Sequence, residues 1–426
     1  MTVIVFTVSL LAAMAIGMPI AYALLICGVA LMWYIDIFDA QIIAQNVING
    51  ADSFPLMAVP FFMLAGEIMN TGGLAKRIVD VALAACGHIR GGLGYVAILT
   101  SCILASLSGS AVADAAALAA LLVPMMVAAG HDKAKSAGLV AAGGIIAPII
   151  PPSIGFVLFG VAGGVSITKL FLAGIAPGIM LGLGLCVAWW WVARNDQAES
   201  LPRRSAREIL KAVRDGFWAL MLPFIIIFGL RFGIFTPTEA AVVVAVYSLF
   251  IAVFVYRELK PTQLLGVFVS AAQTTAIVMF LVAAALVSSW LITVSDIANQ
   301  IVGLVQPFMG NNTILMIALM VIVVIVGTAL DMTPTILILT PILMPIVKQA
   351  GIDPVYFGVL FIINNAIGLI TPPVGVVLNV VCGVSKISME DIIKGVWPFM
   401  IAQLLVLLLL ILFPVLVTGP ARWLGG

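Results

Sequence analysis

Long apolar runs separated by short polar interruptions dominate this 426-residue chain. The clearest runs cover residues 2–35, 217–230, 240–256 and 401–418. Apolar runs of about 18 residues or more are long enough to cross the hydrocarbon core of a bilayer as helices. Because the second run is short and the first is long, run length does not settle the count. We expect roughly ten to twelve membrane-inserted segments in an all-α polytopic membrane protein.

Composition supports this class and excludes others. The chain is 64% hydrophobic and 9% charged, whereas soluble domains average about 45–50% and about 25%. A net charge of +1 argues against a nucleic-acid partner. The five cysteines form no CxxC, so neither a disulfide framework nor a zinc site is indicated. The two histidines, His88 and His131, are expected in loops or at the interface. With no cluster of His, Cys or paired carboxylates, an enzyme is not expected.

The chain contains an internal duplication. Adding 221 to residue numbers in the first half brings "GGIIAPIIPPSIGF" (143–156) onto residues 364–377, which overlap "AIGLITPPVGVVLN" (366–379), so that Pro151 matches Pro372 and Pro152 matches Pro373. Further pairs are Pro124 with Pro345, Gly130 with Gly351, Asp132 with Asp353, Gly174 with Gly395 and Pro177 with Pro398. No gap is needed. This period is too long for a solenoid and is typical of the two-fold repeats of secondary transporters.

The repeat divides the chain at its longest polar stretch. We predict a first half at 1–193, a basic connector at 194–216 and a second half at 217–426. The connector holds five arginines and one lysine, so it is expected in the cytoplasm; it could equally be only a solvated linker. A second polar stretch at 36–53 is either an arm lying at the interface or an ordinary extramembrane helix. The three tryptophans at 189–191 are interpreted as part of an interfacial belt.

The double prolines mark places where a membrane helix is interrupted. Proline removes a backbone donor and clashes with the preceding turn. Lipid cannot satisfy the freed polar groups, so such a break persists only when it is buried in protein or lines a wet cavity. Matching breaks in two halves are the best sequence indication of a transporter's binding site.

Each half contains a second interruption upstream of its double proline. "ASLSGSAVAD" (105–114) corresponds to "GTALDMTP" (327–334), with Ser106 on Gly327 and Ser110 on Asp331. Small residues permit close backbone approach. The alternative for Ser106, Ser108 and Ser110 is hydroxyl bonding to the preceding turn of one continuous helix. The repetition favours a site, and it predicts a re-entrant hairpin and a discontinuous helix in each half.

At this point the sequence resembles the large membrane subunit of the TRAP (tripartite ATP-independent periplasmic) transporters. The residues that carry the resemblance span the chain: 49–78, "SLSGSAVAD" (106–114), 143–156, "FTPTEAAVV" (235–243) and "GLITPPVG" (368–375). The resemblance implies inverted repeats, two hairpins with adjacent sodium sites, and a transport domain that moves against a scaffold as an elevator.

Sodium is a hard cation that prefers oxygen ligands, which unwound carbonyls and helix C-termini supply. In the second half we expect ligands at Gly327, Gly368, Thr371 and Val374. The repeat places the first-half site at Ser106, Ala147, Ile150 and Ser153, with Ser108, Ser110 and Pro152 close by. No organic cofactor is expected.

The cargo implied by the resemblance is a small organic anion, such as a C4-dicarboxylate, sialic acid or a related sugar acid. An anion can sit at helix N-termini, and the candidate contacts are Ser110, Ser153, Asn364, Asn365 and Asp331. An acid at bilayer depth is a functional candidate by default. Asp331 could alternatively cap the helix that follows it, so both interpretations stay open. A proton-coupled carrier using Asp331, Asp114 or Glu67 is the alternative to sodium coupling.

Two other acids are interpreted structurally. "TPTE" (236–239) predicts a capping box with Pro237 at the first helical position. Glu67 is expected to pair with Lys76 or Arg77 near a membrane surface, in preference to relaying protons.

The resemblance also implies partners and a location. We expect a periplasmic substrate-binding protein and a small four-helix membrane subunit, the latter as a separate chain because this sequence begins directly with the large-subunit pattern. The expected location is the bacterial inner membrane, with several passes through the lipid bilayer.

Overall fold

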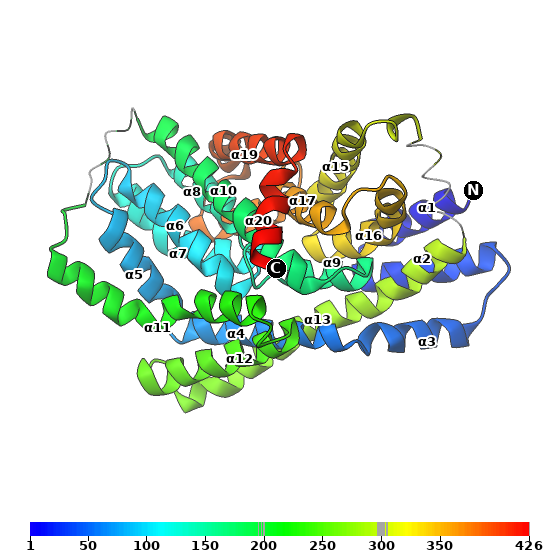
Figure 1. Cartoon of the computed structure of the whole chain (residues 1–426), viewed down its shortest axis with the longest axis horizontal. Helices are drawn as coiled ribbons and strands as arrows, with labels where there is room; N and C mark the ends of the chain where they lie inside the picture. The colour runs from blue at the N-terminus through cyan, green and yellow to red at the C-terminus, as the bar shows by residue number, and fades with distance from the viewer. Residues whose placement is uncertain (195, 197, 199–200, 296–302, 304–305, 426) are drawn as a thin grey trace.

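The computed structural model describes residues 1–194, 196, 198, 201–295, 303 and 306–425, and this part of the chain is helical without strands (Figure 1). The first half contains α1 (Thr2–Ala15), α2 (Ile20–Tyr34), α3 (Ala40–Ala51), η1 (Phe54–Met57), α4 (Ala58–Thr71), α5 (Leu74–Cys86), α6 (Gly92–Ser108), α7 (Ala111–Ala128), α8 (Lys133–Gly144), α9 (Ile154–Gly163) and α10 (Ile167–Ala193).

The second half repeats this order. It contains α11 (Ala206–Arg231), α12 (Pro237–Phe250), η2 (Ile251–Val255), α13 (Pro261–Val294), η3 (Gln306–Phe308), α15 (Asn312–Ala329), α16 (Met332–Gln349), α17 (Pro354–Gly368), α18 (Val376–Ser385), α19 (Met389–Leu412) and α20 (Val415–Gly425). The first residues of α3, α7 and α8 become those of α13, α16 and α17 when 221 is added. The duplication seen in the sequence is therefore a duplication of structure.

The two halves interlock through reciprocal contacts. α7 packs against α18, and the equivalent pair with the halves exchanged, α16 and α9, also packs together. In the same way, α4 packs against α12, and the pair that corresponds with the halves exchanged, α13 and α2, also packs together. Such reciprocity means that each half buries surface of the other, and the hydrophobic core includes residues of both halves.

Nine helices in the described residues are long and apolar enough to cross a membrane. Six shorter apolar helices accompany them, among them α9 and α18, which follow the double prolines. The prediction of a multi-pass, all-helical protein with interrupted helices is thus confirmed.

The arm predicted at 36–53 contains α3, which Asp39 caps by accepting a hydrogen bond from the Gln41 N–H at 2.7 Å. α3 packs against α13, and the two run side by side along the lower edge of Figure 1. In the first half the chain leaves α3 through η1 to α4, whereas the second half covers the equivalent stretch with the single helix α13.

The connector is shorter than the sequence suggested. Ser205 and Glu208 form a capping box that starts α11 at Ala206, so the predicted boundary at residue 216 falls inside a helix. The predicted capping box, Thr236 with Glu239, is confirmed, with Pro237 in the first turn of α12.

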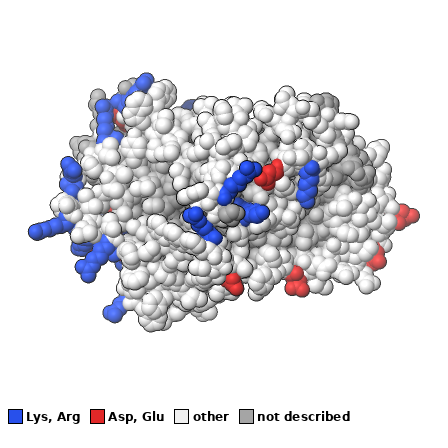
Figure 2. Space-filling model, in the orientation of Figure 1, with Lys and Arg blue, Asp and Glu red and all other residues white. Residues whose placement is uncertain are grey.

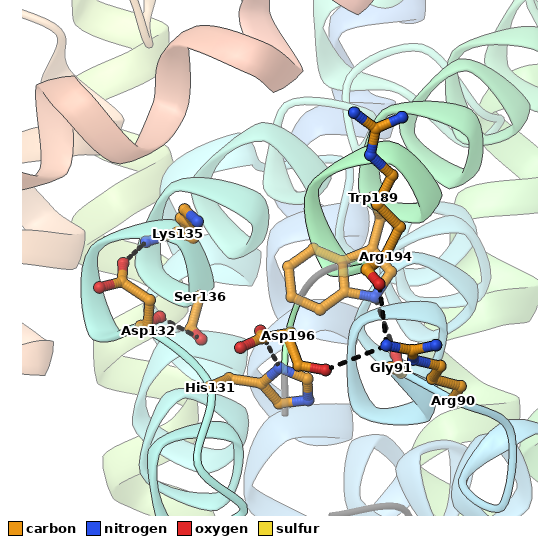
Figure 3. Close-up of polar contacts among 9 residues, drawn as sticks. All are labelled: Arg90, Gly91, His131, Asp132, Lys135, Ser136, Trp189, Arg194 and Asp196. Carbon is orange, nitrogen blue, oxygen red and sulfur yellow. Dashed lines mark hydrogen bonds and ion pairs between the residues drawn. The ribbon is translucent and has the colours of Figure 1, made fainter. Parts of the chain in front are cut away.

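The described connector residues are held against loops of the first half (Figure 3). Asp196 pairs with the His131 ring at 2.9 Å, and the Arg90 guanidinium donates to the Arg194 carbonyl at 2.8 Å. Trp189 donates to the Gly91 carbonyl at 2.8 Å and is fully buried. The prediction of an interfacial belt is therefore wrong for Trp189, although Trp190 and Trp191 are exposed.

Charged side chains are unevenly distributed over the surface. Figure 2 shows Lys and Arg gathered mainly at the end of the molecule where α5 and α11 lie in Figure 1, while the other end carries Asp and Glu. This polarity gives the two ends of the molecule different electrostatic character.

Close helix contact between the halves gives a stability prediction. A Cβ on Gly138 of α8 would lie 2.6 Å from the carbonyl carbon of Gly395 in α19, where only backbone could move aside. Gly138→Ala should therefore lower the thermal unfolding midpoint, since overpacking costs about 1–3 kcal/mol. Gly266→Ala in α13 is the control, because a Cβ there meets nothing within 4 Å and alanine gains up to about 1 kcal/mol of helix propensity. Equal midpoints for the two variants would contradict the close contact.

Candidate functional site

Four helices of the chain are interrupted in two matched pairs. Gly109 and Ser110 separate α6 from α7, and the equivalent interruption between α15 and α16 lies at Leu330–Asp331. α8 is separated from α9, and α17 from α18, by the double-proline segments, in which the Pro151–Pro152 and Pro372–Pro373 peptide bonds are cis. Gly109 is left-handed with φ +63°, a conformation in which glycine carries no Cβ penalty.

The two first-half interruptions touch each other. A Cβ on Gly109 would lie 2.8 Å from the Pro152 carbonyl oxygen. The Ser108 hydroxyl donates to the Asp114 carboxylate and accepts from the Ser110 N–H at 3.1 Å. Ser110 then caps α7 by accepting from the Ala113 N–H at 3.4 Å. Asp114 is 3% exposed, and its Oδ2 has no hydrogen-bond partner among the described residues.

The two second-half interruptions lie even closer to each other. A Cβ on Gly368 would lie 2.9 Å from the Gly327 Cα, so the ends of α15 and α17 meet backbone to backbone. Asn365 faces the same point: its amide nitrogen donates to the Met332 carbonyl at 3.1 Å. Its Oδ1 is buried without a partner among the described residues, 3.0 Å from the position of a Gly327 Cβ.

One cavity of about 490 Å³ opens onto these interruptions. A wall formed by α4 and α13 faces the broken helices across it. First-turn residues of α7, α9, α16 and α18 all line it. The broken-helix side contributes Ser108–Ala113, Ala116, Ile154, Gly155, Leu158, Asp331, Met332, Thr333, Leu369 and Val376; the opposite wall contributes Phe62, Met63, Gly66, Glu67, Asn70, Thr274, Ile277 and Val278.

This arrangement gives the cavity a definite electrostatic character. The N-terminus of a helix carries roughly half a positive charge and presents free N–H groups, so four such ends together favour an anion. The described lining includes no Lys, Arg or His. Its two ionisable side chains are Glu67 and Asp331. An anion here would therefore be held by backbone N–H groups, without a guanidinium or ammonium partner.

The opposite helix ends gather carbonyl oxygens. The last four carbonyls of a helix lack intrahelical partners, and these include those of Ser106 in α6 and Gly327 in α15. The carbonyls of Ala147, Ile150 and Pro152 lie in the non-helical segment after α8 and accept no backbone hydrogen bond from a described residue. Together with Asn365 Oδ1 and Asp114 Oδ2, these oxygens match the ligand preference of a hard cation.

The predicted site residues divide into two groups. Ser108, Ser110 and Asp331 line the cavity. Asp331 occupies the N-cap position of α16, but its side chain makes no capping hydrogen bond and stays exposed to the cavity.

Other predicted residues hold the interruptions together. Ser106 bonds back to the Ile103 carbonyl at 2.6 Å, as the alternative interpretation proposed. Ser153 is fully buried, donates to the Pro148 carbonyl and caps α9. Asn364 donates to the Met320 carbonyl in α15. Ser153, Asn364 and Asn365 are not among the cavity-lining residues, so the structure does not bring these three expected anion contacts to this cavity.

Thr371 and Val374 lie in the second double-proline segment. The Thr371 hydroxyl donates to the Ile367 carbonyl at 2.8 Å, which leaves its lone pairs for a cation. The Val374 carbonyl accepts the Asn379 amide at 2.8 Å. The Gly368 carbonyl accepts the Thr371 N–H at 3.0 Å. Each of these oxygens keeps acceptor capacity after its protein hydrogen bond.

The sequence interpretation of Glu67 is wrong. Glu67 accepts the Ser270 hydroxyl at 3.0 Å and faces the cavity, while Arg77 pairs with Glu258 at 2.7 Å and lies over the Tyr256 ring. The α4–α5 turn at Gly72–Gly73 separates Glu67 from the two basic residues. Asn70 and Thr274 were missed as well, since nothing in the sequence shows that α4 and α13 face the interruptions.

Comparisons with known proteins agree with this geometry. The family model described as "Tripartite ATP-independent periplasmic transporter, DctM component" matches residues 7–416. The 2,3-diketo-L-gulonate TRAP transporter large permease protein YiaN of Escherichia coli (strain K12) is 54% identical over 425 residues, which is 100% of both chains. The sialic acid TRAP transporter large permease protein SiaM of Vibrio cholerae is 35% identical over 398 residues, 93% of both chains.

A solved structure supports the fold. The Alcanivorax borkumensis YdaH transporter, described as having an unusual topology, superposes with a TM-score of 0.61 at 14% identity, covering 91% of this chain and 90% of that one. The relatives are permeases, so this chain is a transporter and not an enzyme. By family match and by identity over its whole length, the chain belongs to the large-permease (DctM) component family of the tripartite ATP-independent periplasmic transporters.

Proposed function

We propose that this chain is the membrane carrier that imports a small organic anion together with Na⁺. The observation that carries the proposal is the convergence of four helix N-termini on one cavity whose described lining has no Lys, Arg or His. Such a cavity binds an anion through backbone dipoles. The relatives named for 2,3-diketo-L-gulonate and sialic acid transport organic acids, which supports the same class of cargo.

Sodium coupling is supported by the oxygens at the opposite helix ends. A cation bound at the α15–α17 junction would occupy the space in front of Asn365 Oδ1 and the Gly327 carbonyl, and the equivalent first-half ion would lie near Ser106 and Ala147. Two or more ions moving down their gradient would drive uptake. Because each cation would draw the two helix ends of its half together, it would also help to order the N-termini that bind the anion.

The moving part would be the set of broken helices with their partners, and α4 and α13 would belong to the stationary scaffold. This division is supported by the position of the cavity, which lies between these two groups. Carrying the cavity past the α4–α13 wall as a rigid unit is the elevator mechanism.

The tripartite description of the family supports two partners: a periplasmic protein that delivers the anion and a small membrane subunit that completes the scaffold. The clustering of Lys and Arg at the α5–α11 end (Figure 2) supports a cytoplasmic position for that end by the positive-inside rule. The corresponding location is the bacterial inner membrane.

A proton-coupled carrier is the second candidate. It is favoured by Asp114, a buried carboxylate with one oxygen lacking a partner among the described residues. Such a group could carry a proton, or it could strengthen the first-half cation site.

The two candidates make opposite predictions for reconstituted transport. In proteoliposomes that hold the carrier with its small subunit, uptake of the acid that binds the companion periplasmic protein should require an inward Na⁺ gradient. An inward proton gradient without Na⁺ should give background uptake, because no ion would then order the helix ends. Full uptake on the proton gradient alone would instead support the proton-coupled candidate.

A substitution at Asn365 tests the second-half cation site. Asn365→Leu removes the unpartnered Oδ1 and should raise the Na⁺ concentration for half-maximal uptake about tenfold, as for the loss of one strong polar contact. Asn364→Leu is the matched control. Asn364 is the neighbouring buried amide in α17, but it donates to the Met320 carbonyl of α15, away from Gly327. The control should lower stability and leave the Na⁺ dependence unchanged. The same Na⁺ dependence in both variants would place the ion elsewhere.

A further inference from the structure

The wall of the cavity opposite the broken helices carries polar side chains that the anion site itself does not need. Glu67 and Asn70 project from α4, and Thr274 comes from α13. α4 and α13 pack against each other. Asn70 and Thr274 are exposed to the cavity, and Glu67 is half-buried beside them.

Glu67 is held in place on this wall by one hydrogen bond. Its Oε1 accepts the Ser270 hydroxyl from the preceding turn of α13 at 3.0 Å, and Oε2 has no hydrogen bond to a described residue. Within the described part of the chain, Glu67 has no Lys, Arg or His as an ion-pair partner. Its negative charge therefore faces a cavity that is otherwise built to attract an anion.

A carboxylate in that position discriminates between kinds of anion. An ionised carboxylate only accepts hydrogen bonds, and charge-assisted bonds from hydroxyl groups are about twice as strong as neutral ones. A second carboxylate on the cargo would be repelled by Glu67, with Asp331 adding to the repulsion. The wall is thus complementary to hydroxyl groups and unfavourable for a dicarboxylate.

We propose that Glu67, positioned by Ser270, selects a polyhydroxylated monocarboxylate, that is, a sugar acid. Its carboxylate binds at the helix N-termini, and its hydroxyl groups donate to Glu67 and exchange hydrogen bonds with Asn70 and Thr274. This assignment rests on the proposed function and narrows its cargo to one chemical class. The cavity volume of about 490 Å³ lies in the range of small-molecule sites.

Direct binding to the carrier separates this step from delivery by the periplasmic protein. The purified carrier with its small subunit is titrated in Na⁺ with D-gluconate or with succinate, and the thermal unfolding midpoint is followed. For the unsubstituted protein, D-gluconate should stabilise at a concentration about tenfold lower than succinate. Glu67→Gln should reduce that ratio about tenfold, because it removes both the charged acceptor and the repulsion.

Two further variants make the result specific. Ser270→Ala removes the positioning hydroxyl without touching the cargo and should reduce the ratio in the same direction by a smaller factor. Glu390→Gln makes the same chemical change in an exposed pair with Lys394 and should leave the ratio unchanged. A purely structural role for Glu67 would weaken stabilisation by both anions in parallel.

The outcomes separate this inference from the function on which it rests. An unchanged ratio in both cavity variants, a preference of the unsubstituted protein for succinate, or no stabilisation by D-gluconate would overturn the sugar-acid assignment. Na⁺-driven uptake measured on the same preparation decides the broader proposal: its presence would leave the carrier function standing. Its absence from the unsubstituted protein would overturn both.

Discussion

The structure depends on one constraint: a helix interrupted at bilayer depth must satisfy its free backbone groups without help from lipid. This chain interrupts four helices and turns their free ends in two directions. The N-termini of α7, α9, α16 and α18 open into one cavity, whereas the ends of α15 and α17 meet and Gly109, after α6, lies against the first double-proline segment. Helix N-termini favour anions and helix C-termini favour cations, so the two kinds of free end offer neighbouring surroundings suited to ions of opposite sign.

Close backbone approach is what makes these junctions possible. Gly327 and Gly368 meet without side chains between them, and Gly109 lies against the Pro152 carbonyl. The first half solves the same problem with hydroxyls and a buried carboxylate, through Ser108 and Asp114. The two cation candidates are therefore related by the repeat in position while differing in chemistry, and they need not bind an ion with equal strength.

Much of this arrangement could be predicted from local sequence signals. The double prolines and the capping box at Thr236 act within a few residues of chain, the 221-residue repeat is visible by direct comparison of the two halves, and the structure has all three. Glu67 and Trp189 were misinterpreted because their partners are distant in sequence. Trp189 is buried against the loop at Gly91. Glu67 is hydrogen-bonded by Ser270 of α13, and no local sequence pattern shows that α13 lies beside α4. Burial and pairing across halves follow from the tertiary packing, which a single sequence does not display.

The segment α3–η1–α4 of the first half and its counterpart α13 in the second half differ in continuity. α13 runs without interruption for 34 residues, about 50 Å at the rise of an α-helix, while its counterpart is divided at η1, where Pro55 stands. A continuous helix resists bending along its whole length, whereas a helix divided by a proline-containing turn can bend at that turn. The repeat therefore places a continuous helix in the second half opposite a helix–turn–helix in the first, so bending at Pro55 is open to the first half alone.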